Sequence, residues 1–332
     1  MSRSTESARA PRQARSRATG VALAALAGGG SAVQARVNGE LGTRLGDGIA
    51  AAAVSFGVGL ILVAALTAAT PIGRAGVGRL REAMSSGRLR WWQGLGGLCG
   101  AFFVVSQGIA AGALGVAVFT VASVAGQSVG GLAVDRLGLG PTGRHELTWP
   151  RIAGAALSVV AVAVAAGGLT LAGTSALLAL MPAVAGFLIG WQTAMNGLVR
   201  QATGSVLTTT LLNFATGTVG LALALAVDVA LRGPFGPLPA EPWLYTGGVL
   251  GVLFIAVAAT VVRLTGVLLL GLASIAGQIT GSVVVDYVAP GGAGAPDLST
   301  LVGAALALVA VAVATARPTG LGNRSEGISP VR

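Results

Sequence analysis

A stretch of sequence that occurs twice in the chain decides its fold. Residues 92–135 read WQGLGGLCGAFFVVSQGIAAGALGVAVFTVASVAGQSVGGLAVD, and residues 243–286 read WLYTGGVLGVLFIAVAATVVRLTGVLLLGLASIAGQITGSVVVD. The two copies align without a gap at an offset of 151 residues. Identical residues stand at equivalent positions: Gly97 and Gly248, Gly100 and Gly251, Phe103 and Phe254, and Gly115 and Gly266. The motif ASVAGQ, which ends at Gln127, corresponds to ASIAGQ, which ends at Gln278.

The repeat extends toward the N-terminus of each copy. The spacing Gln34-x3-Asn38 recurs as Gln192-x3-Asn196, and Phe56-x2-Gly59 recurs as Phe214-x2-Gly217, both at an offset of 158. Each copy holds five apolar stretches, and an odd number of crossings makes the second copy enter a membrane from the opposite side. We therefore predict two halves of inverted topology, an arrangement typical of secondary transporters.

The composition excludes an ordinary soluble protein. Hydrophobic residues make up 54% of the 332 residues and charged residues only 10%, against about 25% charged in soluble domains. Ten apolar stretches are each long enough to cross a bilayer as a helix, and the alternation of a membrane β-barrel is missing. They are 19–38, 49–70, 91–111, 114–134, 151–169, 175–196, 206–228, 243–262, 265–287 and 298–316. We predict an all-α membrane protein of ten transmembrane helices in two inverted five-helix repeats.

The charges predict the orientation. The net charge of +10 comes from arginine alone among the basic residues, and these arginines lie between apolar stretches, which favours a lipid bilayer over nucleic acid as partner. Ten crossings place +13 on the side of the termini and −3 on the other side. By the positive-inside rule, we expect a bacterial inner-membrane protein with both termini in the cytoplasm.

The predicted organisation has four parts. Residues 1–18 form a basic cytoplasmic tail, 19–170 the first repeat, 171–316 the second repeat and 317–332 a second cytoplasmic tail. One cysteine, Cys99, and one histidine, His145, provide neither a disulfide nor a histidine-based metal site. No phosphate-binding loop or catalytic triad is visible, so we expect no cofactor, no metal and no enzymatic activity.

The repeated motifs also carry a family resemblance. The pattern Gly-x3-Ala-x-Gln-x3-Asn at residues 28–38, Ser-Phe-x2-Gly at 55–59 and Ala-Ser-x-Ala-Gly-Gln at 122–127, with an aspartate eight residues later, resembles the YdcZ-like branch of the drug/metabolite transporter superfamily. The resemblance implies ten helices in two inverted halves and export of small molecules. Asn213 replaces the motif serine in the second copy, and Arg36 has no charged counterpart there.

Four polar residues are expected near the middle of the membrane. Gln127 lies eight residues before Asp135, about 12 Å deeper in its helix, and Gln278 is equally placed in the second copy. Ser123 and Ser274 each lie four residues before these glutamines, on the same helix face. Polar groups at this depth mark substrate pathways, and they also join helices by hydrogen bonds. Both roles, substrate contact and helix association, remain open.

Two further pairs have alternative roles. Gln34 with Asn38, and Gln192 with Asn196, each share a helix face late in the predicted helix, where they either contact substrate or cap the helix end. Trp191 either stacks on a ligand or packs in the core. Beside them, Arg36 either extends to the membrane surface or binds a substrate anion.

The remaining candidates concern packing and coupling. Gly126, Gly130, Gly277 and Gly281 form Gly-x3-Gly faces that predict close helix packing. Asp135 and Asp286 lie at helix ends and are either structural or the groups that couple transport to protons. We expect an exporter of small organic solutes or metabolites that works by alternating access. The alternative is a membrane-embedded structural or sensory partner without transport; substrate, coupling and oligomeric state are left open.

Overall fold

The computed structural model describes residues 3–141, 143–144, 146–167 and 174–315. His145, the predicted boundary between the two repeats and the C-terminal tail lie outside these residues. Helices form the regular structure of the described part, without a strand of a sheet. They are α1 (Arg3–Leu45), α2 (Gly48–Ala69), α3 (Pro71–Ser85), η1 (Trp91–Leu95), α4 (Gly96–Ser106), η2 (Gln107–Ala111), α5 (Gly112–Leu114), α6 (Val116–Leu137), α7 (Trp149–Ala165), α8 (Thr174–Thr203), α9 (Val206–Arg232), η3 (Pro242–Tyr245), α10 (Gly247–Val288) and α11 (Leu298–Ala314).

Six helical segments of the described part are long and apolar enough to cross a membrane. They are Ala18–Leu45, Gly48–Ala69, Trp91–Leu114, Val116–Leu137, Leu178–Thr203 and Val206–Arg232. Three shorter apolar helices, Trp149–Ala165, Gly247–Val257 and Leu298–Ala314, coincide with the predicted fifth, eighth and tenth spans. The chain is therefore an all-helical protein with several membrane-spanning candidates.

Helix α1 is longer than the sequence predicts. It ends at Leu45 and not at residue 38, because Gly46 at φ 63° turns the chain before α2 begins at Gly48. The Asp47 carboxylate accepts hydrogen bonds from the backbone N–H of Ile49 and Ala50, which caps α2. Glu40, which follows the predicted stretch 19–38, consequently lies within α1.

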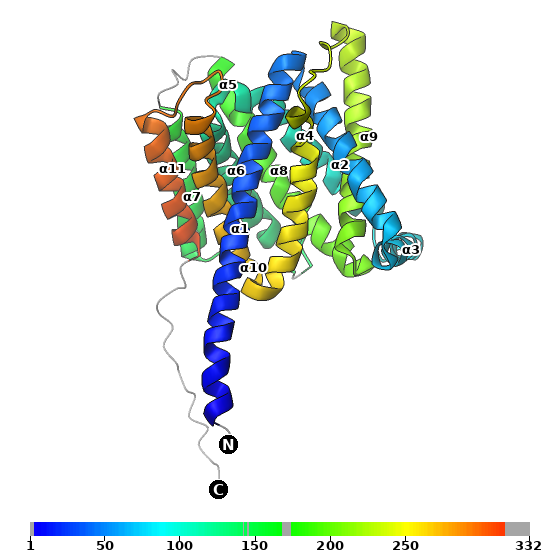
Figure 1. The fold of residues 1–332 in the computed structure, drawn as a ribbon, viewed down its shortest axis with the longest axis vertical. Helices are drawn as coiled ribbons and strands as arrows, with labels where there is room; N and C mark the ends of the chain where they lie inside the picture. Colours follow the sequence, from blue (N-terminus) through cyan, green and yellow to red (C-terminus); the bar gives the residue numbers. More distant parts are fainter. Residues whose placement is uncertain (1–2, 142, 145, 168–173, 316–332) are drawn as a thin grey trace.

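Helix α3 occupies a segment that the sequence pattern indicates as a loop. Thr70 caps its first turn by accepting a hydrogen bond from Gly73 N, and Pro71 occupies its first position, where a missing N–H costs nothing. Gly73, Gly76 and Ala83 are buried, whereas Arg74 and Arg81 are exposed. Figure 1 shows this amphipathic helix at the lower end of α2 and α9.

The two ends of α10 lie at the same level of the molecule. Asn38 on α1 lies against Gly247 at the start of α10, while Arg36 donates a hydrogen bond to Pro290 O just beyond its end. A straight helix of these 42 residues would be about 63 Å long. The chain therefore turns back within α10, and Figure 1 shows its yellow first part descending and its orange last part rising beside α1.

The predicted halves are interlaced. Helix α1 packs mainly against α10, and α8 packs mainly against α6 and α4 (Figure 1). Each half thus inserts its first helix between helices of the other half. The contacts depend on glycines, because a Cβ on Gly277 would lie 1.9 Å from Ala25 O and one on Gly126 would lie 1.9 Å from Ala183 O.

Helices α2 and α9, which hold equivalent positions in the two halves, pack against each other. Phe56 and Phe214 hold equivalent positions in the repeat, and their ring centroids lie 5.0 Å apart. Gly59 faces Phe214, whereas Gly217 faces Phe56. Since the residue number falls along one helix as it rises along the other, the two equivalent helices run antiparallel.

Candidate functional site

A buried pair of amides joins α1 to the end of α4. Asn38 Nδ2 donates a hydrogen bond of 2.7 Å to Gln107 Oε1, and the two residues are 0% and 1% exposed. Gln107 begins η2, a single π-helical turn, and such insertions are frequent at functional sites. The last part of α1 therefore has a specific, buried polar partner on another helix.

Glycines of α10 complete this first amide cluster. A Cβ on Gly247 would lie 2.2 Å from Asn38 Oδ1 and 2.9 Å from Ser55 Oγ. One turn later, a Cβ on Gly251 would lie 3.1 Å from Gln34 Nε2. Only glycine lets the α10 backbone approach these polar side chains so closely.

A second amide cluster lies between α8, α9 and α4. Asn213 Nδ2 donates a 2.6 Å hydrogen bond to Asn196 Oδ1, and Gln192 Nε2 lies 3.4 Å from Asn213 Oδ1. Gly96 faces Asn196 and Asn213, and Gly100 faces Gln192. These glycines hold the positions equivalent to Gly247 and Gly251, so the same contacts occur twice in the molecule.

The polar partner of the repeated asparagine differs between the clusters. Asn38 uses Gln107 from the end of α4, and Asn196 uses Asn213 from α9, where the first copy has Ser55. The repeated sequence pattern does not single out Gln107. Its signal was a glutamine within an apolar stretch whose equivalent in the second copy is Ala258.

Several buried amide atoms have no hydrogen-bond partner among the described residues. They are Asn38 Oδ1, Gln107 Nε2 and Gln192 Oε1. A buried polar atom without a partner costs free energy, typically about 1–3 kcal/mol. The two clusters therefore retain donors and acceptors without a partner among the described residues.

The capping alternative for these asparagines is wrong. Helix α1 continues for seven residues beyond Asn38, to Leu45, and α8 continues beyond Asn196 to Thr203. Both side chains consequently lie inside helices, where their amides bond to other helices.

The four residues predicted near the midplane lie on α6 and the last part of α10. Gln127 and Gln278 are half-buried, and the described residues offer neither side chain a hydrogen bond. Ser123 and Ser274 are buried, and Ser123 Oγ donates 2.8 Å to Phe119 O in its own helix. The backbones of both serines lie at helix crossings, against Gly186 and Gly28 respectively.

The four glycines of the Gly-x3-Gly faces lie at the crossings of these same helices. Gly126 and Gly130 face the α8 backbone at Ala183 and Phe187, where a Cβ would come within 1.9 and 2.4 Å of the carbonyl oxygens. Gly277 and Gly281 face α1, where a Cβ on Gly281 would lie 2.8 Å from Gly29 Cα.

Trp191 has an aromatic partner. Its ring centroid lies 5.8 Å from that of Trp92 at the start of η1, at an angle of 36°. Both side chains are half-buried, so the indole of Trp191 packs on the protein while keeping an accessible part.

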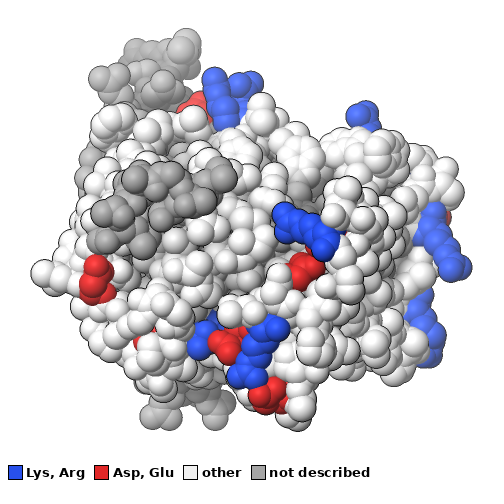
Figure 2. Space-filling view, turned by 90° about the horizontal axis from the view of Figure 1, so that it is seen from above, with Lys and Arg blue, Asp and Glu red and all other residues white. Residues whose placement is uncertain are grey.

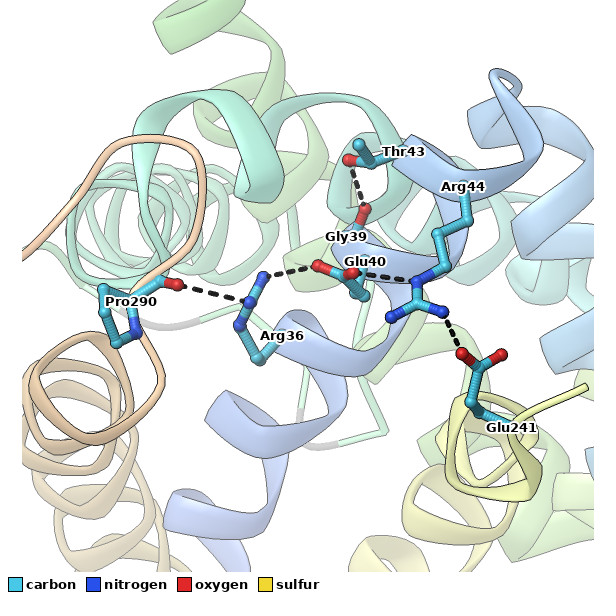
Figure 3. A network of polar contacts seen from close by, with 7 residues as sticks. All are labelled: Arg36, Gly39, Glu40, Thr43, Arg44, Glu241 and Pro290. Carbon is cyan, nitrogen blue, oxygen red and sulfur yellow. Dashed lines mark hydrogen bonds and ion pairs between the residues drawn. The ribbon is translucent and has the colours of Figure 1, made fainter. Parts of the chain in front are cut away.

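A chain of charges connects α1 to two loops (Figure 3). Arg36 lies 3.2 Å from Glu40 and donates to Pro290 O at 3.4 Å, while Arg44 pairs with both Glu40 and Glu241. Figure 2 looks onto this end of the molecule, where basic and acidic side chains adjoin on a largely uncharged surface. The hydrogen bond from Arg44 lowers the pKa of Glu241 below its ordinary value.

Two cavities lie outside the amide clusters. One of about 170 Å³ is lined by residues that include Gly115, Val118, Asp286 and Asp297. The other, of about 520 Å³, is lined only by apolar residues of α6, α7, α8 and the adjoining Ala166, among them Val129, Val159 and Phe187. Neither is lined by Gln127 or Gln278.

The comparisons with known proteins place the chain in one family. A family model described as "Putative inner membrane exporter, YdcZ" matches residues 19–164 and 177–314. No curated protein matches the chain. The two matched regions include nearly all the apolar helices and agree with a multi-pass transporter of the inner membrane. Because they cover most of its length, the chain belongs to the YdcZ family.

Proposed function

We propose that the chain is a secondary transporter that exports small organic solutes or metabolites by alternating access of two inverted five-helix halves, residues 19–170 and 171–316. The interlaced packing carries the proposal: equivalent helices α2 and α9 cross antiparallel at Phe56 and Phe214. A contact between equivalent, antiparallel helices supports a twofold axis in the membrane plane. Transporters built this way open alternately to the two sides around a site at the repeat interface.

The paired contacts away from this crossing support the same symmetry. Gly28 lies against Ser274 as Gly186 lies against Ser123, and Gly277 lies against Ala25 as Gly126 lies against Ala183. In each pair of contacts, the residues of one contact are related to those of the other by the repeat offsets of 151 and 158. The turn within α10 supports ten crossings, because it divides that element into the eighth and ninth predicted spans.

The proposed substrate contacts are uncharged. Gln127 and Gln278, with Ser123 and Ser274, line the path near the midplane, and the two amide clusters contact the solute nearer the membrane surfaces. Amides and hydroxyls bind by hydrogen bonds without a net charge, which favours neutral or amphipathic solutes. Trp191 adds an aromatic surface to the second cluster.

The orientation is part of the proposal. Both tails and the segment with α3 are cytoplasmic, and the loops before η3 and after α10 face outward. In a Cys99→Ala background, Ser86→Cys should resist a membrane-impermeant thiol reagent in intact cells, whereas Ala295→Cys should be labelled. Both positions are exposed in the structure. Labelling with the opposite pattern would overturn the orientation.

Transport is tested in inside-out membrane vesicles with a panel of radiolabelled neutral and amphipathic solutes. We expect energised vesicles that contain the protein to accumulate at least one solute, and the Gln127→Ala, Gln278→Ala double variant to lose this accumulation. Gln201→Ala is the matched control, because Gln201 is exposed at the end of α8. If no solute accumulates, the protein serves as a structural or sensory partner; normal flux in the double variant would remove the two glutamines from the site.

A further inference from the structure

Asp135 and Asp286 occupy equivalent positions in the repeat but make different contacts. Asp286 is 3% exposed, and its two carboxylate oxygens accept hydrogen bonds from Val116 N at 3.0 Å and Ala117 N at 2.7 Å. Asp135 instead forms an ion pair with Arg151, with about a third of each side chain exposed. One aspartate thus caps a helix of the other half, and its counterpart does not.

The cap lies where the helix is interrupted. Gly115, at φ 82° and ψ 153°, separates the end of α5 from the start of α6. The first N–H groups of a helix have no acceptor within it, and a glycine has no side chain to provide one. A carboxylate satisfies these donors and places its charge at the positive end of the helix dipole. Asp286 therefore stabilises the conformation in which the helix is interrupted at Gly115.

The equivalent aspartate does not form the equivalent cap. Gly266, Val267 and Leu268 correspond to Gly115 and the two capped residues, and they lie next to the turn between the two arms of α10. Asp135, the counterpart of Asp286, is paired with Arg151.

We infer that the two aspartates cap alternately during the transport cycle. The inference rests on the proposed function, because two inverted halves exchange their conformations between the two openings. In the opposite state, the helix is interrupted at Gly266, Asp135 accepts from the amides of residues 267 and 268, and Asp286 is released as the segment at Gly115 becomes helical. Both aspartates are positioning residues that hold one opening at a time.

A reporter cysteine tests the exchange without a known substrate. Val118 is 4% exposed, follows the capped amides directly and lines the cavity beside Asp286. In a Cys99→Ala, Val118→Cys protein, labelling by an impermeant thiol reagent measures how often this end opens. We expect slow labelling, accelerated about fivefold by Asp286→Ala, the usual effect of losing a helix cap on an equilibrium.

The decisive variant combines both substitutions. Asp135→Ala removes the cap of the other state, so it should slow the labelling of Asp286→Ala back toward the starting rate. If Asp135 has only a local role, the double variant should be labelled as fast as Asp286→Ala or faster. This result would overturn the inference. Asp297→Ala is the control, because Asp297 lines the same cavity but caps its own helix by accepting a hydrogen bond from Thr300 N. Any change in labelling caused by Asp297→Ala should not be reversed by adding Asp135→Ala.

The asparagine variant separates capping from proton transport. Asp286→Asn keeps one of the two acceptors, so its labelling rate should lie between those of the parent and Asp286→Ala, and flux should persist. Loss of flux with unchanged labelling would make Asp286 a proton carrier and overturn the inference. Detergent melting confirms that each variant is folded; if Asp286→Ala unfolds, slower labelling in Asp135→Ala alone replaces it. If the labelling rates of the variants change as expected but no solute is transported, only the proposed export is contradicted.

Discussion

The glycine at the crossing of α10 and α1 provides a sharp test of the packing. A Cβ on Gly277 would lie 1.9 Å from Ala25 O, whereas real Cβ atoms almost never approach within 3.0 Å. The obstacle is a backbone carbonyl, which no side-chain rotation removes. Gly277→Ala therefore forces the two helices apart by at least about 1.1 Å.

The magnitude follows from two opposing effects. Overpacking a tight contact costs about 1–3 kcal/mol, and replacing glycine by alanine inside a helix returns about 0.8–1 kcal/mol. We expect a net loss of up to about 2 kcal/mol in Gly277→Ala. Gly271→Ala in the same helix has nothing within 4 Å of its Cβ, so it should instead gain about 0.8–1 kcal/mol.

The assay is the unfolding free energy in mixed detergent micelles, followed by circular dichroism as sodium dodecyl sulfate is added. The repeat provides a second matched pair, because a Cβ on Gly126 would lie 1.9 Å from Ala183 O while Gly131 has nothing within 4 Å. Gly126→Ala should therefore behave like Gly277→Ala, and Gly131→Ala like Gly271→Ala. Equal stability of Gly277→Ala and Gly271→Ala would refute the close crossing.

Two further predictions use the same unfolding measurement, and a third uses thermal melting as a function of pH. Asn38→Leu and Gln107→Leu should each cost about 1–3 kcal/mol, because each leaves a buried amide unpaired, and the double variant should cost less than the sum; additive losses would contradict the pair. Phe56→Ala and Phe214→Ala should each cost about 3–5 kcal/mol, with a coupling of about 0.5–1.5 kcal/mol that independent packing would not produce. A lowered pKa of Glu241 means that its ion pair stabilises the fold above the ordinary value of about 4.3 and is lost as pH falls through the lowered value. The difference in melting temperature from Glu241→Gln should accordingly be constant from about pH 7 to 5 and disappear at more acidic pH; a difference that persists there would refute it.

The sequence by itself determined the membrane character and the helices. Long apolar stretches can satisfy their backbone hydrogen bonds in lipid only as helices, so composition and stretch length were sufficient. The repeat alone identified the equivalent positions, because small residues and amides recur where backbones approach closely. Boundaries were less certain: α1 extends to Leu45, and α3 forms where a loop was expected, since short polar segments carry no such constraint.

Only the tertiary structure decided which equivalent residues meet. The amide spacing identified Asn38 and Asn196, but their partners come from different helices, Gln107 from the end of α4 and Asn213 from α9. The roles of Asp135 and Asp286 were likewise indistinguishable in sequence. A repeat makes two segments equivalent in chemistry, yet each side chain bonds to whatever the interlaced packing brings within about 3 Å, and that packing depends on contacts between residues far apart in the chain.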